Sequence, residues 1–263
     1  MKKLLGELEL NKIYHMDCLE GMKLIPDKSI DMILCDLPYG VTARNKWDCI
    51  IDLDKLWLQY KRIIKDNGVI ALFAQTPFDK ILGASNIKML KYEWIWDKTK
   101  GSGFLNAKRM PLRQHENILV FYKKQPTYNP QMEEGKPYKD KRTTRYKEKS
   151  KIEREIIMDL MGQHIKKPIE NKGTRYPGTV QKFSNGNNGN IHPTQKPVAL
   201  FEYLIKTYTN EGDLVLDNCM GSGTTAIACI NTNRNYIGFE IDEEYYKLAI
   251  NRIEEHKANL FNT

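Results

Sequence analysis

The stretch DLVLDNCMGSGTTAIACIN, residues 213–231, decides the fold class of this chain. Its first five residues form a short apolar run ending in Asp217, as expected of a buried β-strand, and Gly221 and Gly223 separate this run from a segment of helical length. A further apolar run, residues 235–242, follows the expected helix. Strand, glycine turn, helix and strand in this order predict a βαβ unit of a parallel, doubly wound sheet.

The same alternation continues on both sides of this unit. Strands are expected over residues 12–17, 29–36, 69–74, 92–96 and 116–122, and helices over residues 18–25, 52–66, 197–208 and 243–256. Residues 184–190 read SNGNNGN, a composition typical of a flexible joint. The 263 residues therefore predict an α/β fold, a doubly wound Rossmann-like sheet built from residues 1–122 and 190–263, with residues 123–189 inserted as a smaller lobe.

The net charge of +8 comes from this predicted insertion. The chain has 41 Lys and Arg against 33 Asp and Glu, and residues 123–182 alone hold 16 against 8, so the remainder is balanced at 25 each. Tyr128, Tyr138 and Tyr146 are interleaved with these cations. Such a pattern is typical of a surface that follows phosphates and stacks on bases. A solvated insertion that binds nothing is the alternative that composition leaves open.

Composition also argues against several classes of protein. The five cysteines form an odd number without CxxC spacing, and the five histidines lack ligand spacing, so neither a disulfide framework nor a metal site is expected. The first 12 residues lack the apolar run of a signal peptide, and no stretch approaches the roughly 18 apolar residues of a membrane span. We expect a reduced, soluble, cytoplasmic protein without a membrane partner.

The glycine loop after Asp217 is expected to bind a ligand, because glycines permit close backbone approach and helix N-terminal amides attract polar groups. Gly221, Gly223 and Ala226 satisfy the dinucleotide pattern G-x-G-x-x-G/A, and Glu240 follows Gly221 by 19 residues, where a ribose-binding acid is expected. Asp217 would repel a pyrophosphate but suits an ammonium and a sulfonium. This favours S-adenosylmethionine; an NAD-dependent oxidoreductase, or a loop that only caps a helix, are the alternatives.

A second motif, ILCDLPYG at residues 33–40, places polar groups at the end of another buried strand. Asp36 can accept a hydrogen bond from an amine, the turn fixed by Pro38 can aim the Leu37 carbonyl at the second hydrogen, and Tyr39 can stack on a ring. The exocyclic amino group of a base is therefore the methyl acceptor that this turn predicts.

Together, ILCDLPYG and VLDNCMGSGTT resemble the amino-methyltransferases of DNA, which carry a D/N/S-P-P-Y/F catalytic motif and an FxGxG-type cofactor motif. The catalytic motif here precedes the basic segment and the cofactor motif follows it, as in the permuted beta group, and HPTQKP at residues 192–197 is similar to the tenth motif of that group. The resemblance covers residues 10–122 and 190–255 and implies that the basic middle is the target-recognition region. One departure is Leu37, where the family usually has proline and uses only the backbone carbonyl.

This resemblance implies a site-specific DNA methyltransferase that uses S-adenosylmethionine. Asp36 at the first motif position is more similar to adenine-N6 enzymes than to cytosine-N4 enzymes. Adenine would be flipped out of double-stranded DNA and held by Tyr39 with Phe73 or Trp47. No Pro-Cys pair is present for the covalent route of cytosine-C5 methylation. A cytosine-N4 methyltransferase and a catalytically inactive, DNA-binding subunit are the alternatives.

The predicted site residues fall into three groups. The catalytic group is Asp36, Leu37, Pro38 and Tyr39. The cofactor group is Asp17, Cys18, Asp36, His192, Thr194, Lys196, Asp217, Cys219, Met220, Gly221, Ser222, Gly223, Thr224, Thr225, Glu240 and Ile241. The DNA-binding group is Lys139, Lys141, Arg142, Arg145, Lys147 and Arg175.

Three residues of the cofactor group carry more specific expectations. Lys196 or Thr194 is expected to hold the methionine carboxylate. Asp17 is expected either to touch the adenine of the cofactor or to cap the helix that follows it. Family habit further implies a homodimer and a cognate restriction endonuclease as candidate partners.

Overall fold

A computed structural model of the chain describes residues 3–40, 50–139, 170–184 and 195–261. The chain divides into two compact units, one of Met1–Asn129 with Gly178–Thr263 and one of Pro130–Pro177. In the second unit, β8 (Glu133–Glu134) pairs with β11 (Thr174–Arg175), and β9 (Tyr138–Lys139) pairs with β10 (Glu170–Asn171). This unit falls inside the predicted insertion, whose limits at residues 123 and 189 stay a prediction.

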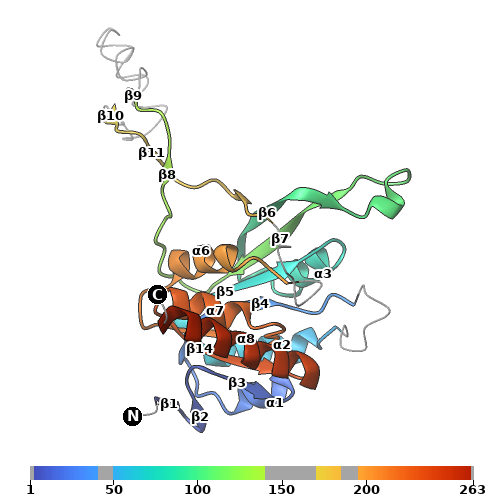
Figure 1. Ribbon diagram of the computed structural model, residues 1–263, viewed down its shortest axis with the longest axis vertical. Coiled ribbons are helices and arrows are strands. Elements are labelled where there is room, and N and C mark those ends of the chain that lie inside the picture. The colour runs from blue at the N-terminus through green and yellow to red at the C-terminus, as the bar shows by residue number, and fades with distance from the viewer. Residues whose placement is uncertain (1–2, 41–49, 140–169, 185–194, 262–263) are drawn as a thin grey trace. The chain divides into compact units, whose positions relative to one another are not determined.

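The first unit is built on one eight-stranded sheet, in the order β12-β6-β7-β5-β4-β13-β14-β3 (Figure 1). Its strands are β3 (Lys12–His15), β4 (Ile30–Asp36), β5 (Ile64–Ala74), β6 (Leu90–Ser102), β7 (Arg113–Phe121), β12 (Val180–Lys182), β13 (Leu214–Asp217) and β14 (Asn235–Glu240). The five strands from β5 to β3 run parallel, and β7 is antiparallel to both of its neighbours. This confirms the predicted α/β, Rossmann-like sheet.

Helices cover both faces of this sheet (Figure 1). They are α1 (Cys18–Lys23), α2 (Leu53–Ile63), α3 (Phe78–Ser85), α6 (Val198–Tyr208), α7 (Thr224–Asn231) and α8 (Glu243–Phe261). Apolar residues of α1, α2 and α3 form one core with one side of the strands, and those of α6, α7 and α8 form a second core with the other side. Strand β4 carries apolar side chains on both faces, because Ile33 faces the first core while Met32 faces the second. Among the described residues, no helix is both long and apolar enough to span a membrane.

The order of the strands creates a switch point between β4 and β13. These two strands are parallel neighbours, with Leu216 opposite Ile33. The chain leaves β4 through α2 towards β5 on one side, and leaves β13 through α7 towards β14 on the other. A crevice opens at the carboxyl ends of strands where the winding reverses. Asp36 and Asp217, the last residues of β4 and β13, are therefore brought to the same place.

Some elements differ from those expected. Helix α2 ends at Ile63, and β5 begins at the next residue, so the helix is shorter than residues 52–66. Helix α3 was not expected, because Gly83 and the few apolar residues between Phe78 and Leu82 give a weak periodic signal. Strand β12, inside the predicted insertion limits, joins the large sheet by pairing with β6, for example Gln181 with Trp96. Such pairing between distant segments leaves no local signal in the sequence.

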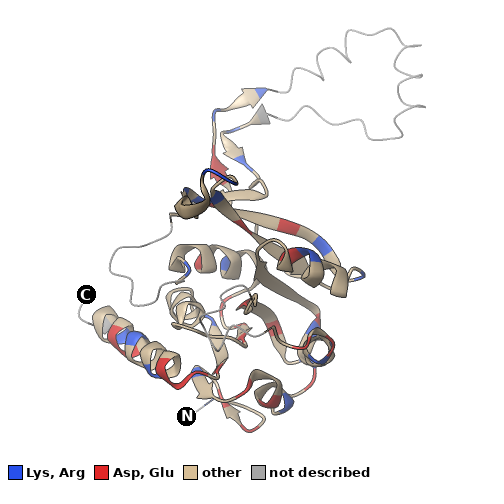
Figure 2. Cartoon of the chain, turned by 90° about the vertical axis from the view of Figure 1, so that its right-hand side faces the viewer, with Lys and Arg blue, Asp and Glu red and all other residues tan. Residues whose placement is uncertain are grey.

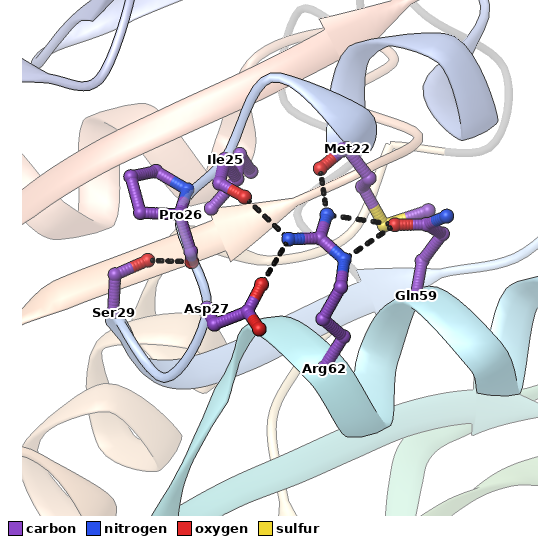
Figure 3. Close-up of polar contacts among 7 residues, drawn as sticks. All are labelled: Met22, Ile25, Pro26, Asp27, Ser29, Gln59 and Arg62. Atoms are coloured by element: carbon purple, nitrogen blue, oxygen red, sulfur yellow. Dashed lines mark hydrogen bonds and ion pairs between the residues drawn. The ribbon is translucent and has the colours of Figure 1, made fainter.

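Arg62, in the last turn of α2, ties this helix to the connection between α1 and β4 (Figure 3). Its guanidinium donates to the carbonyl oxygens of Met22 and Ile25, both at 2.7 Å, and to Asp27 Oδ1 at 2.7 Å. Gln59 Oε1 accepts from its Nη2 at 2.8 Å. One planar fork thus binds a carbonyl in the last turn of α1 and another just after this helix, and ties the connection to β4 to α2.

Arg62→Met is expected to lower the free energy of unfolding by about 2 kcal/mol, since the carbonyls of Met22 and Ile25 lose charge-assisted donors. Urea unfolding of the full chain, followed by circular dichroism, measures this change. Lys61→Met removes a neighbouring exposed cation and is the control, with an expected change within about 0.5 kcal/mol. Equal effects of the two variants would contradict a specific role for the Arg62 fork.

Candidate active site

A cavity of about 890 Å³ lies at the carboxyl ends of the parallel strands in the first unit. This volume is within the range of about 300–1,000 Å³ typical of small-molecule sites. The predicted residues that line it are Asp17, Cys18, Asp36, Leu37, Pro38, Tyr39, Lys196, Asp217, Cys219, Met220, Gly221, Ser222, Thr224, Thr225, Glu240 and Ile241. Both sequence motifs therefore meet in one cavity.

Asp36 ends β4, and both of its carboxylate oxygens have partners. The Tyr39 hydroxyl donates to Oδ1 at 2.6 Å, and Lys196 Nζ lies 2.7 Å from Oδ2. The Tyr39 ring lies near Phe78, with ring centroids 5.6 Å apart, and Lys196 Nζ lies 5.8 Å from the Tyr39 ring centroid. Leu37, between Asp36 and the Pro38 turn, is buried with its side chain in the first core.

Glu116 completes a buried charge cluster that the sequence analysis did not single out. Its Oε2 lies 3.0 Å from Lys196 Nζ, and Lys98 Nζ contacts its Oε1. Gln75 Nε2 donates to the same Oε1 at 2.6 Å. Asp36 and Glu116 thus face Lys98 and Lys196, which balances two negative charges with two positive charges in a site where unpaired charge is costly.

Burial and ion pairing act in opposite directions on these carboxyl groups. Burial raises the pKa of Asp36 above its ordinary value, while Lys196 opposes this shift and Glu116 adds to it. Burial also acts to raise the pKa of Glu116, but ion pairs with Lys196 and Lys98 outweigh it, so this pKa lies below the ordinary value. The pKa of Lys196 is raised, because its two carboxylate partners outweigh the effect of burial. Lys196 is therefore the cation that favours an ionised Asp36.

The glycine loop after β13 is held by two further carboxylates of the cavity, Asp217 and Glu240. Glu240 Oε2 accepts from the amide of Gly221 at 2.7 Å, and Asp217 Oδ1 accepts from the amide of Cys219 at 3.0 Å. Thr225 donates its hydroxyl to Asp217 Oδ2. Gly221 has φ of 53°, a conformation that favours glycine. The loop is thus shaped by acids at the ends of two adjacent parallel strands.

Burial raises the pKa of Asp217 to about 7 and also raises the pKa of Glu240. Each oxygen of a carboxylate offers two lone pairs, so both acids can accept further hydrogen bonds from a ligand while they hold the loop. The ionised form of Asp217 would gain from a cationic group placed against it. The cavity therefore offers two carboxylates for the amino and hydroxyl groups of a ligand.

Asp17 fulfils one of its two alternative expectations. It caps α1, because its Oδ1 accepts from the amides of Leu19 at 2.8 Å and Glu20 at 3.1 Å. It also lines the cavity, where contact with a cofactor stays a prediction.

Comparison with known proteins places this geometry in a family. Residues 30–251 match the family model described as DNA methylase. The chain belongs to the DNA methylase family. It is 33% identical to the type II methyltransferase M1.MboII of Moraxella bovis over 94% of this chain and 99% of that protein. It is 29% identical to the DNA adenine methyltransferase YhdJ of Escherichia coli over 94% of this chain and 83% of that protein.

Solved structures agree with this assignment. The M1.HpyAVI–SAM complex is 26% identical to this methylase, with a TM-score of 0.60 over 92% of this chain and 98% of that chain. The cytosine-N4-specific PvuII DNA methyltransferase is 16% identical, with a TM-score of 0.62 over 91% of this chain and 84% of that chain. The second likeness concerns the fold alone.

For three predicted residues of the methylase, the structure differs from the expectation. Two of them do not line the cavity, and the third contacts other partners than the one expected. Gly223 does not line the cavity; it precedes α7 with φ of 80°, and an added Cβ would lie 3.3 Å from that of Ala249. Phe73 is fully buried and stacks on Phe201 with centroids 5.1 Å apart, so it is not an exposed platform for a base. Lys196 contacts Asp36 and Glu116, whereas a methionine carboxylate was expected as its partner.

The remaining predicted residues lie in the smaller unit or outside the described residues. Arg175 packs its guanidinium 4.6 Å from the centroid of the Tyr138 ring and donates to the Lys136 carbonyl, so it holds this unit together; Lys139 is exposed beside it in β9. His192, Thr194, Lys141, Arg142, Arg145, Lys147 and Trp47 lie outside the described residues. No cluster of three or more potential metal ligands occurs in the part of the chain that is described.

Proposed function

We propose that this DNA methylase transfers a methyl group from S-adenosylmethionine to the N6 amine of adenine in DNA. The observation that carries the proposal is the single cavity in which Asp36 and Tyr39, at the end of β4, meet the glycine loop and the carboxylates of Asp217 and Glu240. Asp36 is half-buried in the cavity wall and ion-paired with the buried Lys196, as a group that must meet a substrate amine in a largely desolvated site would be.

The cavity fits S-adenosylmethionine in size and in chemistry. Asp217 would hold the methionine ammonium, Glu240 the ribose hydroxyls, and the amide edge of Gly221 and Ser222 the methionine backbone. When bound, this cofactor supplies an electrophilic methyl group on a sulfonium. The relative M1.HpyAVI, which is 26% identical, was solved as a complex with SAM, and this supports the same cofactor here.

Asp36 and Tyr39 would handle the acceptor base. The N6 amine of adenine is engaged in base pairing, so the base must leave the stack to reach a cavity at the carboxyl ends of the strands. Asp36 accepts a hydrogen bond from the amine, stabilises the positive charge that develops on its nitrogen, and takes up the departing proton. The Tyr39 hydroxyl already donates to Asp36, and its ring supplies a stacking surface at the cavity wall.

Lys196 would prepare Asp36 for this role. It favours ionised Asp36 through the 2.7 Å ion pair, and each Asp36 oxygen, with one protein partner, keeps a lone pair for the amine. Glu116, which shares Lys196, opposes the ionisation of Asp36. Lys196 or Thr194 was expected to hold the methionine carboxylate; the partners of Lys196 support a positioning role for it instead.

Two further observations support adenine as the base and DNA as the substrate. Asp stands at the first position of the catalytic motif, and a relative that is 29% identical is named a DNA adenine methyltransferase. The basic segment at residues 123–182, with Lys139 and Arg175 in its described part, would contribute to target recognition. A homodimer and a cognate restriction endonuclease stay predictions.

The identity of the methylated base tests this proposal directly. Purified protein is incubated with S-adenosylmethionine and unmethylated duplex DNA, and the DNA is digested to nucleosides for mass spectrometry. N6-methyl-2′-deoxyadenosine is the expected product. N4-methyl-2′-deoxycytidine would overturn the assignment of the base while keeping the methylase. Binding of S-adenosylmethionine without any methylated product on varied genomic DNA would favour an inactive, DNA-binding subunit.

A further inference from the structure

The hairpin between β6 and β7 extends past the rest of the sheet (Figure 1). β5 pairs with β7 only between Phe121 and Asn117, and β12 pairs with β6 only up to Asp97. Beyond these points the two strands pair with each other alone, and Ser102 pairs with Arg113 at the far end. The tip, residues 103–112, begins with Gly103, which has φ of 90°, and contains η1 (Phe104–Asn106).

The tip exposes apolar side chains. Leu105 is fully exposed at 103%, Phe104 is 71% exposed and Met110 is 49% exposed. Single exposed apolar residues are ordinary, but three within seven residues at the end of an extended hairpin form an unpartnered apolar tip.

Cations without carboxylates surround this apolar tip. Residues 99–115 contain no Asp or Glu, and Lys100, Lys108, Arg109 and Arg113 are all exposed. Figure 2 marks Lys and Arg along the described chain in blue and Asp and Glu in red. Within the described parts of the chain, none of these four side chains forms an ion pair. A surface of this composition is complementary to a polyanion and repels another cationic surface.

The same hairpin forms part of the wall of the candidate active site. Trp96, Lys98, Ser102 and Arg113, all from β6 and β7, line the cavity. The apolar tip therefore follows directly after residues at the cavity rim.

We propose that the β6–β7 hairpin is a DNA-contacting arm, in which Phe104 and Leu105 enter the base stack where the target base leaves it, and Lys100, Lys108, Arg109 and Arg113 contact the adjacent phosphates. Apolar side chains inserted between base steps are a known means of unstacking DNA, and filling the vacated space reduces the cost of extruding a base. The proposal rests on the proposed function for the base-flipping step. It adds a DNA contact separate from the basic insertion.

The apolar part of the arm is tested with Phe104→Ser/Leu105→Ser in the full chain. The sequence that the wild-type protein methylates is first mapped, and oligonucleotide duplexes that contain it are then prepared. The paired duplex has thymine opposite the target adenine, and the abasic duplex has an abasic residue there. On the paired duplex the variant is expected to lose about tenfold or more in kcat. On the abasic duplex, where extrusion costs less, kcat should return to within about twofold of wild type. Ile87→Ser is the control, because it removes an exposed apolar side chain that precedes the first residue of β6, at the end of this strand away from the tip.

The cationic part is tested by equilibrium binding to an unmethylated duplex at several salt concentrations, without cofactor. Lys108→Ser/Arg109→Ser is expected to weaken binding and to lower the slope of log Kd against log salt by about 2, since each phosphate contact contributes about 0.9. Lys88→Ser/Lys91→Ser removes two exposed lysines at the opposite end of β6 and should leave the slope within about 0.5 of wild type.

Wild-type kcat of the apolar double variant on the paired duplex would overturn the insertion step, and so would a loss of kcat that the abasic duplex does not rescue. An unchanged salt slope of the cationic variant would overturn the phosphate contacts. A changed sedimentation coefficient with unchanged DNA kinetics would show that the tip contacts a second copy of the chain, which also contradicts the proposal. The binding experiment does not depend on methyl transfer, so it tests the phosphate contacts even if the proposed function fails. Failure of the proposed function would appear as wild-type protein that binds DNA but forms no methylated product.

Discussion

Asp36→Asn is expected to lower kcat for DNA methylation by about 1,000-fold at neutral pH. The substitution keeps the size of the side chain and its contact with Tyr39, but removes the charge that stabilises a positive amine nitrogen and the group that takes up its proton. Loss of one electrostatic stabiliser or one general base typically costs about 10²–10⁴ in rate. The measurement is single-turnover transfer of labelled methyl from S-adenosylmethionine to duplex DNA.

Cofactor affinity separates this role from a structural one. Asp36 lies at the end of β4, whereas the glycine loop is held by Asp217 and Glu240 from other strands. The Kd for S-adenosylmethionine in Asp36→Asn should therefore stay within about threefold of wild type, measured by calorimetry. Asp97→Asn, on β6 and outside the cavity lining, is the matched control and should keep wild-type kcat. A kcat for Asp36→Asn within about tenfold of wild type would contradict catalysis by this carboxylate.

The site residues that could be predicted from the sequence are those whose role is indicated by their immediate neighbours in the chain. An apolar run that ends in an acid marks a strand and its carboxyl end, and Asp36 and Asp217 carry this signal independently. The rule that ligands bind at the carboxyl ends of parallel strands then places both acids in one crevice. The observed pairing of β4 with β13 confirms that step, since it required only that the two strands be neighbours.

Glu116 shows why the rest of the site was not predicted. It begins the apolar run of β7 and is 80 residues distant from Lys196 in the chain. The antiparallel pairing of Glu116 with Trp96 brings it beside Lys98, and the segment before α6 then places Lys196 against it. No spacing or motif encodes these contacts, because they depend on strand order. An acid at the start of the buried, mostly apolar run that ends β7 was the local signal available.

Lys196→Met is the second variant with a large expected effect, because it removes the cation that favours ionised Asp36. Lys196 lowers the pKa of Asp36 against the effect of burial, so without it this pKa rises further. Activity requires the ionised carboxylate and is lost as pH falls through its pKa, so the acid-side midpoint of kcat should move to higher pH. At neutral pH, kcat is expected to fall at least about tenfold, with partial recovery at alkaline pH.

Glu116→Gln provides the matched variant with an effect of opposite sign. Glu116 raises the pKa of Asp36, and its removal leaves Lys196 paired with Asp36 alone. The acid-side midpoint of kcat should therefore move to lower pH. The charged and titratable groups around Asp36 are Lys196 before α6, Glu116 on β7, Lys98 on β6, Cys35 on β4, Tyr39 after β4 and Asp217 on β13. The two substitutions each change one of these, which makes the sign of the shift diagnostic.

The same pair of variants decides between the two roles considered for Lys196. If Lys196 positions Asp36, its substitution changes the pH dependence of kcat and leaves the Kd for S-adenosylmethionine within about threefold of wild type. If Lys196 instead holds the methionine carboxylate, its substitution weakens cofactor binding tenfold or more, because a charge-assisted hydrogen bond to the ligand is lost. The acid-side midpoint of kcat then stays unchanged. Since Lys196 lies 2.7 Å from Asp36 and 3.0 Å from Glu116, we expect opposite shifts of the midpoint in Lys196→Met and Glu116→Gln. Shifts in the same direction would contradict a charge cluster that controls the ionisation of Asp36.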